Sequence, residues 1–208
     1  MSIFRPSAHA LITGGASGVG YAVARLCLAH SMRVSIVDFN QTSLDIARKS
    51  LSSSSNSVTF IQADVSSRSD WASICQQVGT DVDLLMLNAG VGGKGTWGDE
   101  DYFDKILATN LGGVVNGLNA YVPGFKKRGG EGKDGKGKEG MAIVITGSKQ
   151  GITNPPGNSA YNASKAAVKT LAEHLSYDLK DSGVGVHLLV PGWTFTGLVS
   201  SPSIFVFA

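Results

Sequence analysis

The sequence predicts an α/β protein built on a doubly wound parallel sheet, and three observations lead to this fold class. Short β-branched runs alternate with longer segments of helical periodicity. The short runs are apolar almost throughout, which is typical of parallel strands that are covered on both faces. The connections between most of these segments are short, as in a chain that alternates between strand and helix. In such sheets ligands bind at the carboxyl ends of the strands.

The elements follow from these patterns in chain order. The predicted strands are residues 9–13, 33–38, 57–64, 82–89, 141–147 and 184–190. The predicted helices are residues 18–31, 41–51, 67–78, 99–126 and 159–181. Residues 50–57 (SLSSSSNS) predict a flexible connector. Residues 129–140 hold six glycines and six charged residues, which predicts a mobile surface loop because little apolar surface can be buried there. An anion-binding lysine loop is the alternative interpretation of this segment.

Composition limits the class of protein. A chain of 208 residues is long enough for one sizeable core, so we expect a single domain over residues 1–208. The net charge of +2 and the 16% of charged residues give no electrostatic reason to expect binding to nucleic acid or membranes. No apolar segment is long enough to span a bilayer, and we expect a cytoplasmic protein. The cysteines, Cys27 and Cys75, predict buried free thiols, and no metal site is expected because the histidines form no ligand-spaced cluster.

A glycine-rich turn, TGGASGVG at residues 13–20, follows the first predicted strand. Gly14 can make the tight turn, Gly18 allows the backbone to approach a phosphate, and Gly20 lets the helix pack close to the strand. The amino end of the following helix offers free N–H groups to a pyrophosphate. The turn therefore predicts a dinucleotide site, and a glycine-rich loop without a ligand is the alternative.

An acidic residue lies at the end of the second predicted strand. Asp38 comes eighteen residues after Gly20, close to the spacing at which a carboxylate hydrogen-bonds the adenosine ribose. A carboxylate at this position repels a 2′-phosphate, and no arginine or lysine follows directly to offset it. The sequence therefore predicts NAD(H) in preference to NADP(H). The alternative is that Asp38 caps the next helix.

Tyr161 and Lys165 are one helical turn apart and so lie on the same face of the last predicted helix. Bringing a phenol from its usual pKa to neutrality requires roughly 4 kcal/mol. A cation at about 4 Å supplies a similar amount at an intermediate dielectric, and an oxidised nicotinamide would add a second positive charge. The pair predicts a phenol that exchanges a proton near neutral pH, and an incidental surface pair is the alternative.

Five motifs occur in the same order as in a known family. They are TGGASGVG (13–20), LNAG (87–90), VITGSKQG (144–151), YNASK (161–165) and PGWTFT (191–196). Over residues 8–196 the chain resembles the short-chain dehydrogenase/reductase family in its compact single-domain branch. The resemblance implies a Rossmann-like sheet with strand order 3-2-1-4-5-6. It also implies an NAD(P)-dependent oxidoreductase that interconverts a secondary alcohol and a ketone by hydride transfer, with Tyr161 as proton donor or acceptor.

The resemblance also implies roles for individual residues. Ser148 would hold the substrate oxygen, Asn110 would hold a water for proton relay, and Lys165 would bind the nicotinamide ribose as well as support Tyr161. Asp64 would contact the adenine and Thr196 the carboxamide. The cofactor contacts implied in this way are Gly14, Ser17, Gly18, Val19, Gly20, Asp38, Asp64, Val65, Asn88, Ala89, Gly90, Tyr161, Lys165, Pro191, Gly192, Thr194 and Thr196. Several of these residue types also cap helices or form turns, which is the alternative for them.

The last motif is followed only by GLVSSPSIFVFA. In the family, the segment after this motif forms a substrate-covering lid, a further helix and a seventh strand, so most of these parts are expected to be missing here. Two alternatives to a small-molecule oxidoreductase therefore stay open. One is a nucleotide- or partner-binding protein without turnover, and the other is an inactive truncated product. Homo-oligomerisation also stays open, because the missing parts commonly contribute to subunit contacts in the family.

Overall fold

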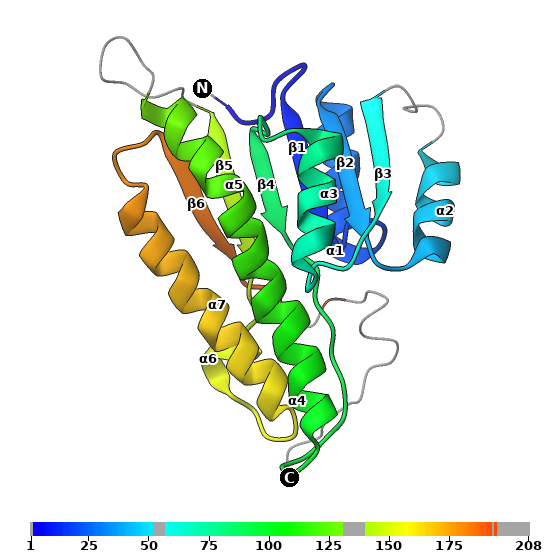
Figure 1. The fold of residues 1–208 in the computed structure, drawn as a ribbon, viewed down its shortest axis with the longest axis vertical. Helices are drawn as coiled ribbons and strands as arrows, with labels where there is room; N and C mark the ends of the chain where they lie inside the picture. Colours follow the sequence, from blue (N-terminus) through cyan, green and yellow to red (C-terminus); the bar gives the residue numbers. More distant parts are fainter. Residues whose placement is uncertain (1, 52–56, 131–139, 193, 195–208) are drawn as a thin grey trace.

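The computed structural model has the sheet that the sequence predicts (Figure 1). The structure describes residues 2–51, 57–130, 140–192 and 194. The sheet has six parallel strands in the order β3-β2-β1-β4-β5-β6, which confirms the predicted topology. The strands are β1 (His9–Thr13), β2 (Arg33–Asp38), β3 (Val58–Gln62), β4 (Leu84–Leu87), β5 (Met141–Thr146) and β6 (Val184–Leu189). Because the order reverses between β1 and β4, their carboxyl ends flank the crevice where such sheets bind ligands.

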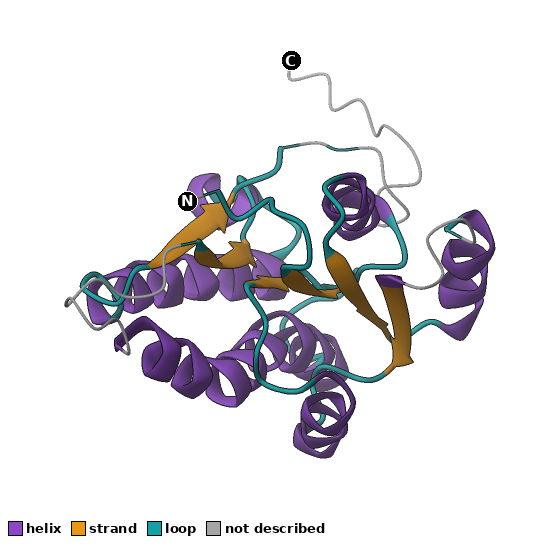
Figure 2. Cartoon of the chain, turned by 90° about the horizontal axis from the view of Figure 1, so that it is seen from above, coloured by secondary structure: helices purple, strands orange, loops and turns teal. Residues whose placement is uncertain are grey.

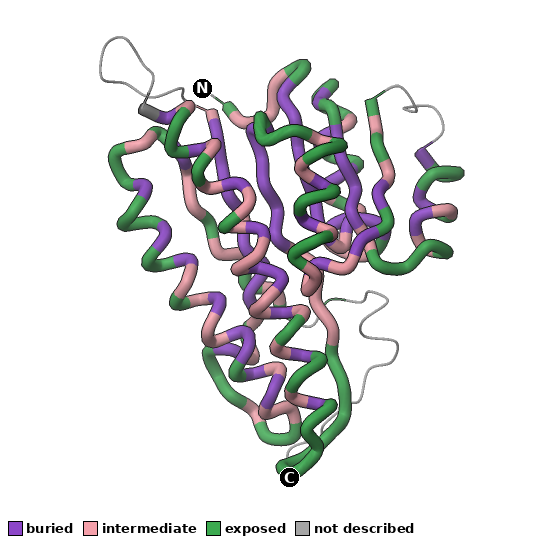
Figure 3. Tube along the Cα trace, viewed as in Figure 1, coloured by how far each residue is buried: buried purple, intermediate pink, exposed green. Residues whose placement is uncertain are grey.

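Helices cover both faces of this sheet (Figure 2). Those on one face are α1 (Gly18–Ala29) and α2 (Gln41–Ser50), and those on the other include α3 (Arg68–Val78), α5 (Gly113–Gly130) and α7 (Ser159–Asp178). Successive strand residues point to opposite faces, so Leu11 belongs to the core under α3, α5 and α7, while Ile12 belongs to the core under α1 and α2. The central strands are therefore buried on both sides (Figure 3), which explains their continuous apolar sequences.

The predicted helix at residues 99–126 is interrupted. It consists of α4 (Glu100–Leu107), a π-helical turn (Ala108–Gly112) and α5, and the last of these continues to Gly130. At the end of the π turn the Gly113 N–H donates to the Ala108 carbonyl, five residues back. Such a change in hydrogen bonding leaves the apolar periodicity of the sequence almost unaltered, so the sequence does not reveal it.

The other differences lie at the ends of elements. The observed β3 and β4 are shorter than the predicted strands 57–64 and 82–89, because the flanking residues form turns and side-chain contacts instead of strand pairs. A one-turn helix after β5, α6 (Gln150–Thr153), was not predicted from the sequence.

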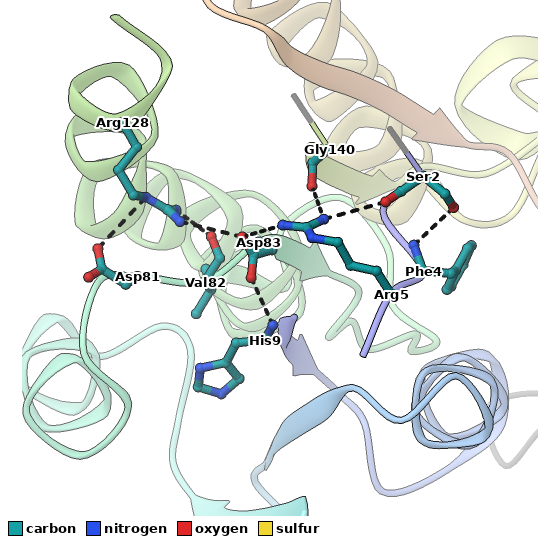
Figure 4. A network of polar contacts seen from close by, with 9 residues as sticks. All are labelled: Ser2, Phe4, Arg5, His9, Asp81, Val82, Asp83, Arg128 and Gly140. Atoms are coloured by element: carbon teal, nitrogen blue, oxygen red, sulfur yellow. Dashed lines mark hydrogen bonds and ion pairs between the residues drawn. The ribbon is translucent and has the colours of Figure 1, made fainter. Parts of the chain in front are cut away.

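A polar network ties the amino edge of the sheet (Figure 4). The Asp83 carboxylate, just before β4, accepts hydrogen bonds from Arg5 Nη2 (2.9 Å) and from the His9 backbone N–H (2.9 Å). Arg128, near the end of α5, places its Nη1 3.7 Å from the same carboxylate. Arg5 Nη1 also donates to the Gly140 carbonyl (2.8 Å). These contacts fix the edge of the sheet that is opposite to the carboxyl ends of the strands.

Three further expectations can be compared with the structure. Both cysteines are free, but only Cys27 is buried, and Cys75 is half-buried because its helix faces a surface groove. Of the predicted connector at 50–57 and the predicted loop at 129–140, residues 52–56 and 131–139 lie outside the described residues. Among the helices that the structure describes, none has the length and apolar character needed to cross a membrane.

Candidate active site

The glycine-rich turn lies between β1 and α1 at the carboxyl edge of the sheet. Gly14 (φ +60°) and Gly18 (φ +53°) have left-handed backbone conformations that favour glycine. A Cβ at Gly14 would lie 2.9 Å from the Ala89 Cα, and one at Gly20 would lie 2.4 Å from the Gly14 carbonyl oxygen. Ser17 is the N-cap of α1, but its side chain makes no capping hydrogen bond, and the first turn of α1 carries no acidic residue.

This geometry fits a dinucleotide pyrophosphate. The amino end of α1 carries backbone N–H groups and a positive dipole, and no carboxylate of its own first turn competes for them. The glycines allow an anion to reach that end of the helix without meeting side chains. Val19, which the sequence also placed here, is partly buried and packs against the core under α1 and α2, and its contact with a cofactor stays a prediction.

The side chain of Asn88 joins three strands at this edge. Its Nδ2 donates to the carbonyls of Thr13 (3.1 Å) and Gly14 (3.2 Å). Its Oδ1 accepts a hydrogen bond from Thr146 Oγ1 (3.1 Å), at the end of β5. The backbone N–H groups of Asn88 and Ala89 donate to Thr13 Oγ1 at 2.9 and 3.1 Å. The amide of Asn88 therefore holds the glycine turn in place from the end of β4.

Asp38 lies at the end of β2, beside the turn. Its Oδ2 accepts the Ala16 N–H (3.2 Å) and its Oδ1 accepts the Asn40 N–H (3.0 Å). The N-cap of α2 is Asn40, whose side chain accepts the Ser43 N–H. The alternative that Asp38 caps the next helix is therefore wrong, and its carboxylate stands beside the glycine turn.

The turn after β3 is held by side chains. Asp64 Oδ1 accepts hydrogen bonds from the N–H (2.8 Å) and the hydroxyl (2.7 Å) of Ser66. Val65 is buried, and its carbonyl accepts hydrogen bonds from Trp71 Nε1 (2.8 Å) and Asn116 Nδ2 (3.2 Å). At least one oxygen of the Asp64 carboxylate thus stabilises a turn, as the alternative interpretation of this residue expected.

Lys165 is a buried cation at the centre of the site, with 4% of its surface exposed. Its Nζ donates to the Thr146 carbonyl (2.8 Å) and lies 5.7 Å from the centroid of the Tyr161 ring. A Cβ at Gly90 would lie 3.5 Å from this Nζ and 3.2 Å from Asn110 Oδ1. A glycine at position 90 therefore allows the end of β4 to approach both side chains.

The Ser148 hydroxyl, just after β5, lies near the Tyr161 phenol of α7. Burial raises the pKa of Tyr161 above its ordinary value, and the nearby Ser148 hydroxyl opposes this effect. Burial also lowers the pKa of Lys165 to about 8. The expectation that Lys165 brings the phenol pKa toward neutrality is wrong for the chain by itself, because the Lys165 ammonium faces the Thr146 carbonyl and desolvation of Tyr161 outweighs the other effects.

Asn110 lies in the π turn and is fully buried. Its Oδ1 accepts the Val91 N–H (2.7 Å), and its Nδ2 donates to the Val91 carbonyl (3.0 Å) and to Ser164 Oγ (3.2 Å). The side chain thus binds the segment after β4 to α7. The water-holding role that the resemblance implied for Asn110 stays a prediction, and these contacts show only how its side-chain amide is used.

The residues after β6 approach the end of β5. The Pro191 carbonyl accepts the Lys149 N–H (3.1 Å), and Thr194 Oγ1 donates to the Gly192 carbonyl (3.4 Å). Thr196, the predicted carboxamide contact, lies outside the described residues.

Comparison with known proteins decides the family. Residues 8–203 match the family model described as short chain dehydrogenase. The chain belongs to the short-chain dehydrogenase/reductase family. This result confirms the family that the five sequence motifs indicate.

Relatives of this dehydrogenase match it over most of its length. An oxidoreductase of Sarocladium schorii is 32% identical over 190 residues, which cover 88% of this chain and 70% of the relative. A diacetyl reductase ((S)-acetoin forming) of Staphylococcus aureus is 31% identical over 197 residues, covering 92% and 73%. A crystal structure of a short chain dehydrogenase/reductase from Burkholderia phymatum in complex with NAD has a TM-score of 0.85, with 29% identity and coverage of 95% and 69%. The chain is thus an NAD(P)-dependent short-chain dehydrogenase/reductase.

Sequence reasoning missed three residues that shape the site of the dehydrogenase. Thr13 and Thr146 make the hydrogen bonds that connect β1 and β5 to Asn88. Gly151, in α6, has no room for a side chain, because a Cβ there would lie 2.5 Å from the backbone carbon of Lys165. Each lies within a recognised motif, but only the pairing of distant strands and helices reveals its contact.

We predict that Lys165→Met stabilises the folded chain at neutral pH. Folding lowers the pKa of Lys165 from 10.5 to about 8, so below pH 8 burial of the charge costs about 3 kcal/mol. The lost hydrogen bond to Thr146 offsets about 1 kcal/mol of the gain, which leaves the variant more stable by about 2 kcal/mol at pH 7. The burial cost disappears as the pH rises from 8 through 10.5, so the advantage of the variant must shrink over that window.

Urea unfolding of both proteins at pH 7 and at about pH 10.5 measures this difference. Lys169→Met is the matched control, since Lys169 lies one turn further along α7 with 39% of its side chain exposed. We expect little change from this control at either pH. A Lys165→Met protein that is less stable than the wild type at pH 7 would contradict the prediction.

Proposed function

We propose that this dehydrogenase interconverts a secondary alcohol and a ketone with NAD(H) as cofactor. The observation that carries the proposal is the buried Lys165 ammonium, which lies 5.7 Å from the centroid of the Tyr161 ring, with the Ser148 hydroxyl near the same phenol. This group stands at the carboxyl edge of the sheet, where the glycine turn fits a dinucleotide. A binding protein without turnover has no use for such a combination of hydroxyl, phenol and buried cation.

Cofactor binding is assigned to residues at the carboxyl ends of the strands. The turn from Gly14 to Gly20 would hold the pyrophosphate, Asp38 the adenosine ribose and Lys165 the nicotinamide ribose. When bound, the nicotinamide supplies or accepts the hydride at the substrate carbon. The protein's own contribution is to orient the substrate oxygen and to move its proton.

Proton transfer is assigned to Tyr161. The Tyr161 phenol would donate its proton to a ketone oxygen during reduction, and its phenolate would take the proton back during oxidation. The Ser148 hydroxyl would donate a hydrogen bond to the same oxygen and stabilise the developing alkoxide. The Lys165 ammonium would stabilise the phenolate that remains after the transfer.

Asn110 is assigned a positioning role. Its side chain holds Val91, and with it Gly90, against α7, so the end of β4 stays in contact with Lys165. A proton relay through the side-chain amide of Asn110 is not part of the proposed mechanism, because that amide is bonded to Val91 and Ser164.

The preference for NAD(H) rests on Asp38. Its carboxylate accepts backbone hydrogen bonds from both sides, so it is held beside the turn where the adenosine ribose would lie. A 2′-phosphate at this place would meet a like charge at close range. The NAD complex of the Burkholderia phymatum relative supports a nicotinamide cofactor here, and the diacetyl reductase among the relatives supports a small carbonyl substrate.

We expect Tyr161→Phe to lower kcat for ketone reduction by about a thousandfold, because proton donation to the substrate oxygen is lost. NADH affinity should change little, since the phenol hydroxyl is not assigned to the cofactor. Following NADH oxidation at 340 nm with a set of small ketones measures the rate. Tyr177→Phe, at a residue of α7 that is 73% exposed, is the control and should keep full activity. An unchanged rate in Tyr161→Phe would rule out the proposed mechanism.

We expect Asp38→Ala to move the cofactor preference toward NADPH. The variant loses charged hydrogen bonds to the ribose and the repulsion of a 2′-phosphate, so the ratio of NADPH to NADH affinity should rise at least about tenfold. Fluorescence titration with each cofactor measures both dissociation constants. Asp45→Ala removes the same charge from the half-exposed surface of α2 and should leave the ratio unchanged. Equal affinity of the wild type for the two cofactors would contradict the assignment of Asp38.

A further inference from the structure

The hydroxyl of Tyr102 is buried without a hydrogen-bond partner among the described residues. Tyr102 lies in α4 and is 7% exposed, and its hydroxyl oxygen is one of the few buried side-chain atoms left unpaired there. A phenylalanine would fill the same apolar space without this cost. Unpaired buried polar groups are uncommon in native proteins, and such a group calls for an explanation such as an unseen ligand.

The ring of Tyr102 belongs to the same apolar cluster as the proposed proton donor. Tyr102, Ile106 and Ala160 form the buried part of this cluster, and Val91 and Tyr161 pack against it. The cluster joins α4 to the start of α7, two elements that run side by side at one end of the molecule (Figure 1). The cluster that contains Tyr102 therefore borders the proton donor of the proposed reaction.

A glycine-rich segment after β4 covers the ring. A Cβ at Gly95 would lie 2.2 Å from Cγ of Tyr102, and one at Gly93 would lie 3.8 Å from its Cε2. In the orientation that its surroundings require, the side-chain amide of Asn158 donates to the Gly93 carbonyl (3.1 Å). The Tyr102 ring is thus enclosed between the segment that follows β4 and the start of α7.

This cover is thin. Gly92, Gly93 and Gly95 carry no side chains, and a Cβ added at Gly92 would meet no atom of the described residues within 4 Å. Segments with few packed side chains open locally at low cost in free energy.

We propose that Tyr102 is a specificity-determining residue whose hydroxyl hydrogen-bonds a second oxygen of the substrate. The inference rests on the proposed function and narrows its substrate class. Preferred substrates are carbonyl compounds that carry another hydroxyl or carbonyl group, such as hydroxyketones and diketones, in preference to simple monoketones. A site with a buried group built for a hydrogen bond discriminates strongly against compounds that leave the group unpaired.

The test compares Tyr102→Phe with the wild type on a matched pair of substrates, cyclohexanone and 2-hydroxycyclohexanone. We expect kcat/KM for the hydroxyketone to fall about tenfold or more, because one hydrogen bond in a site shielded from water is lost. For the monoketone, kcat/KM should stay within about twofold of the wild-type value. The dissociation constant of the hydroxyketone, measured with NADH present, should weaken by a similar factor. Trp97 reports this binding by fluorescence, because its ring lies 5.1 Å from that of Phe103, the neighbour of Tyr102.

Tyr121→Phe is the matched control. Tyr121 is fully buried in α5 and packs against Trp71 in a different part of the core, and its hydroxyl likewise has no hydrogen-bond partner among the described residues. This variant should change neither substrate's kinetics. Tyr102→Phe should not melt at a lower temperature than the wild type, because it removes a polar atom that has no partner among the described residues.

Two results would overturn the inference. One is that Tyr102→Phe leaves the hydroxyketone unaffected, and the other is that both substrates lose activity to the same extent. A wild type that turns over neither ketone would count against the proposed function, and the binding measurement then decides the inference alone. In that case, a hydroxyketone that binds the wild type no tighter than Tyr102→Phe would overturn it.

Discussion

The side-chain amide of Asn88 is the contact on which the rest of the site depends. It holds the carbonyls of Thr13 and Gly14 on one side and the hydroxyl of Thr146 on the other. The carbonyl of the same Thr146 accepts the hydrogen bond from Lys165 Nζ. A continuous set of contacts therefore runs from the glycine turn through Asn88 and Thr146 to the buried lysine. In the proposed mechanism, this connection sets the place of the cofactor relative to the groups that move the proton.

The fold supports a site whose buried polar groups lower the free energy of unfolding. A lysine with its ammonium buried and a tyrosine whose hydroxyl has no partner among the described residues both oppose folding, and each lies near the carboxyl ends of β4 and β5. Two large apolar cores, one on each face of the sheet, offset this cost. The network around Asp83 fixes the opposite edge, where no chemistry is proposed. The network that stabilises the amino ends of the strands is thus distinct from the proposed site at their carboxyl ends.

Sequence reasoning found the parts of the site that depend on local pattern. The glycine turn, the acid at the end of β2 and the pairing of Tyr161 with Lys165 follow from residue types at fixed spacings, and the structure has each on the expected element. The π turn around Asn110 was missed because an altered hydrogen-bond ladder leaves the periodicity of the sequence unchanged. The direction of the Tyr161 pKa was also missed, because desolvation depends on tertiary packing that spacing does not encode.

A crystal structure of the protein grown with saturating NADH tests the central claim most directly, because that claim joins the glycine turn and the α7 pair into one site. The account predicts a dinucleotide with its pyrophosphate at the turn from Gly14 to Gly20, its adenosine ribose at Asp38 and its nicotinamide beside Tyr161. A dinucleotide bound with its nicotinamide away from Tyr161, or a turn that stays empty at saturating NADH, would contradict it.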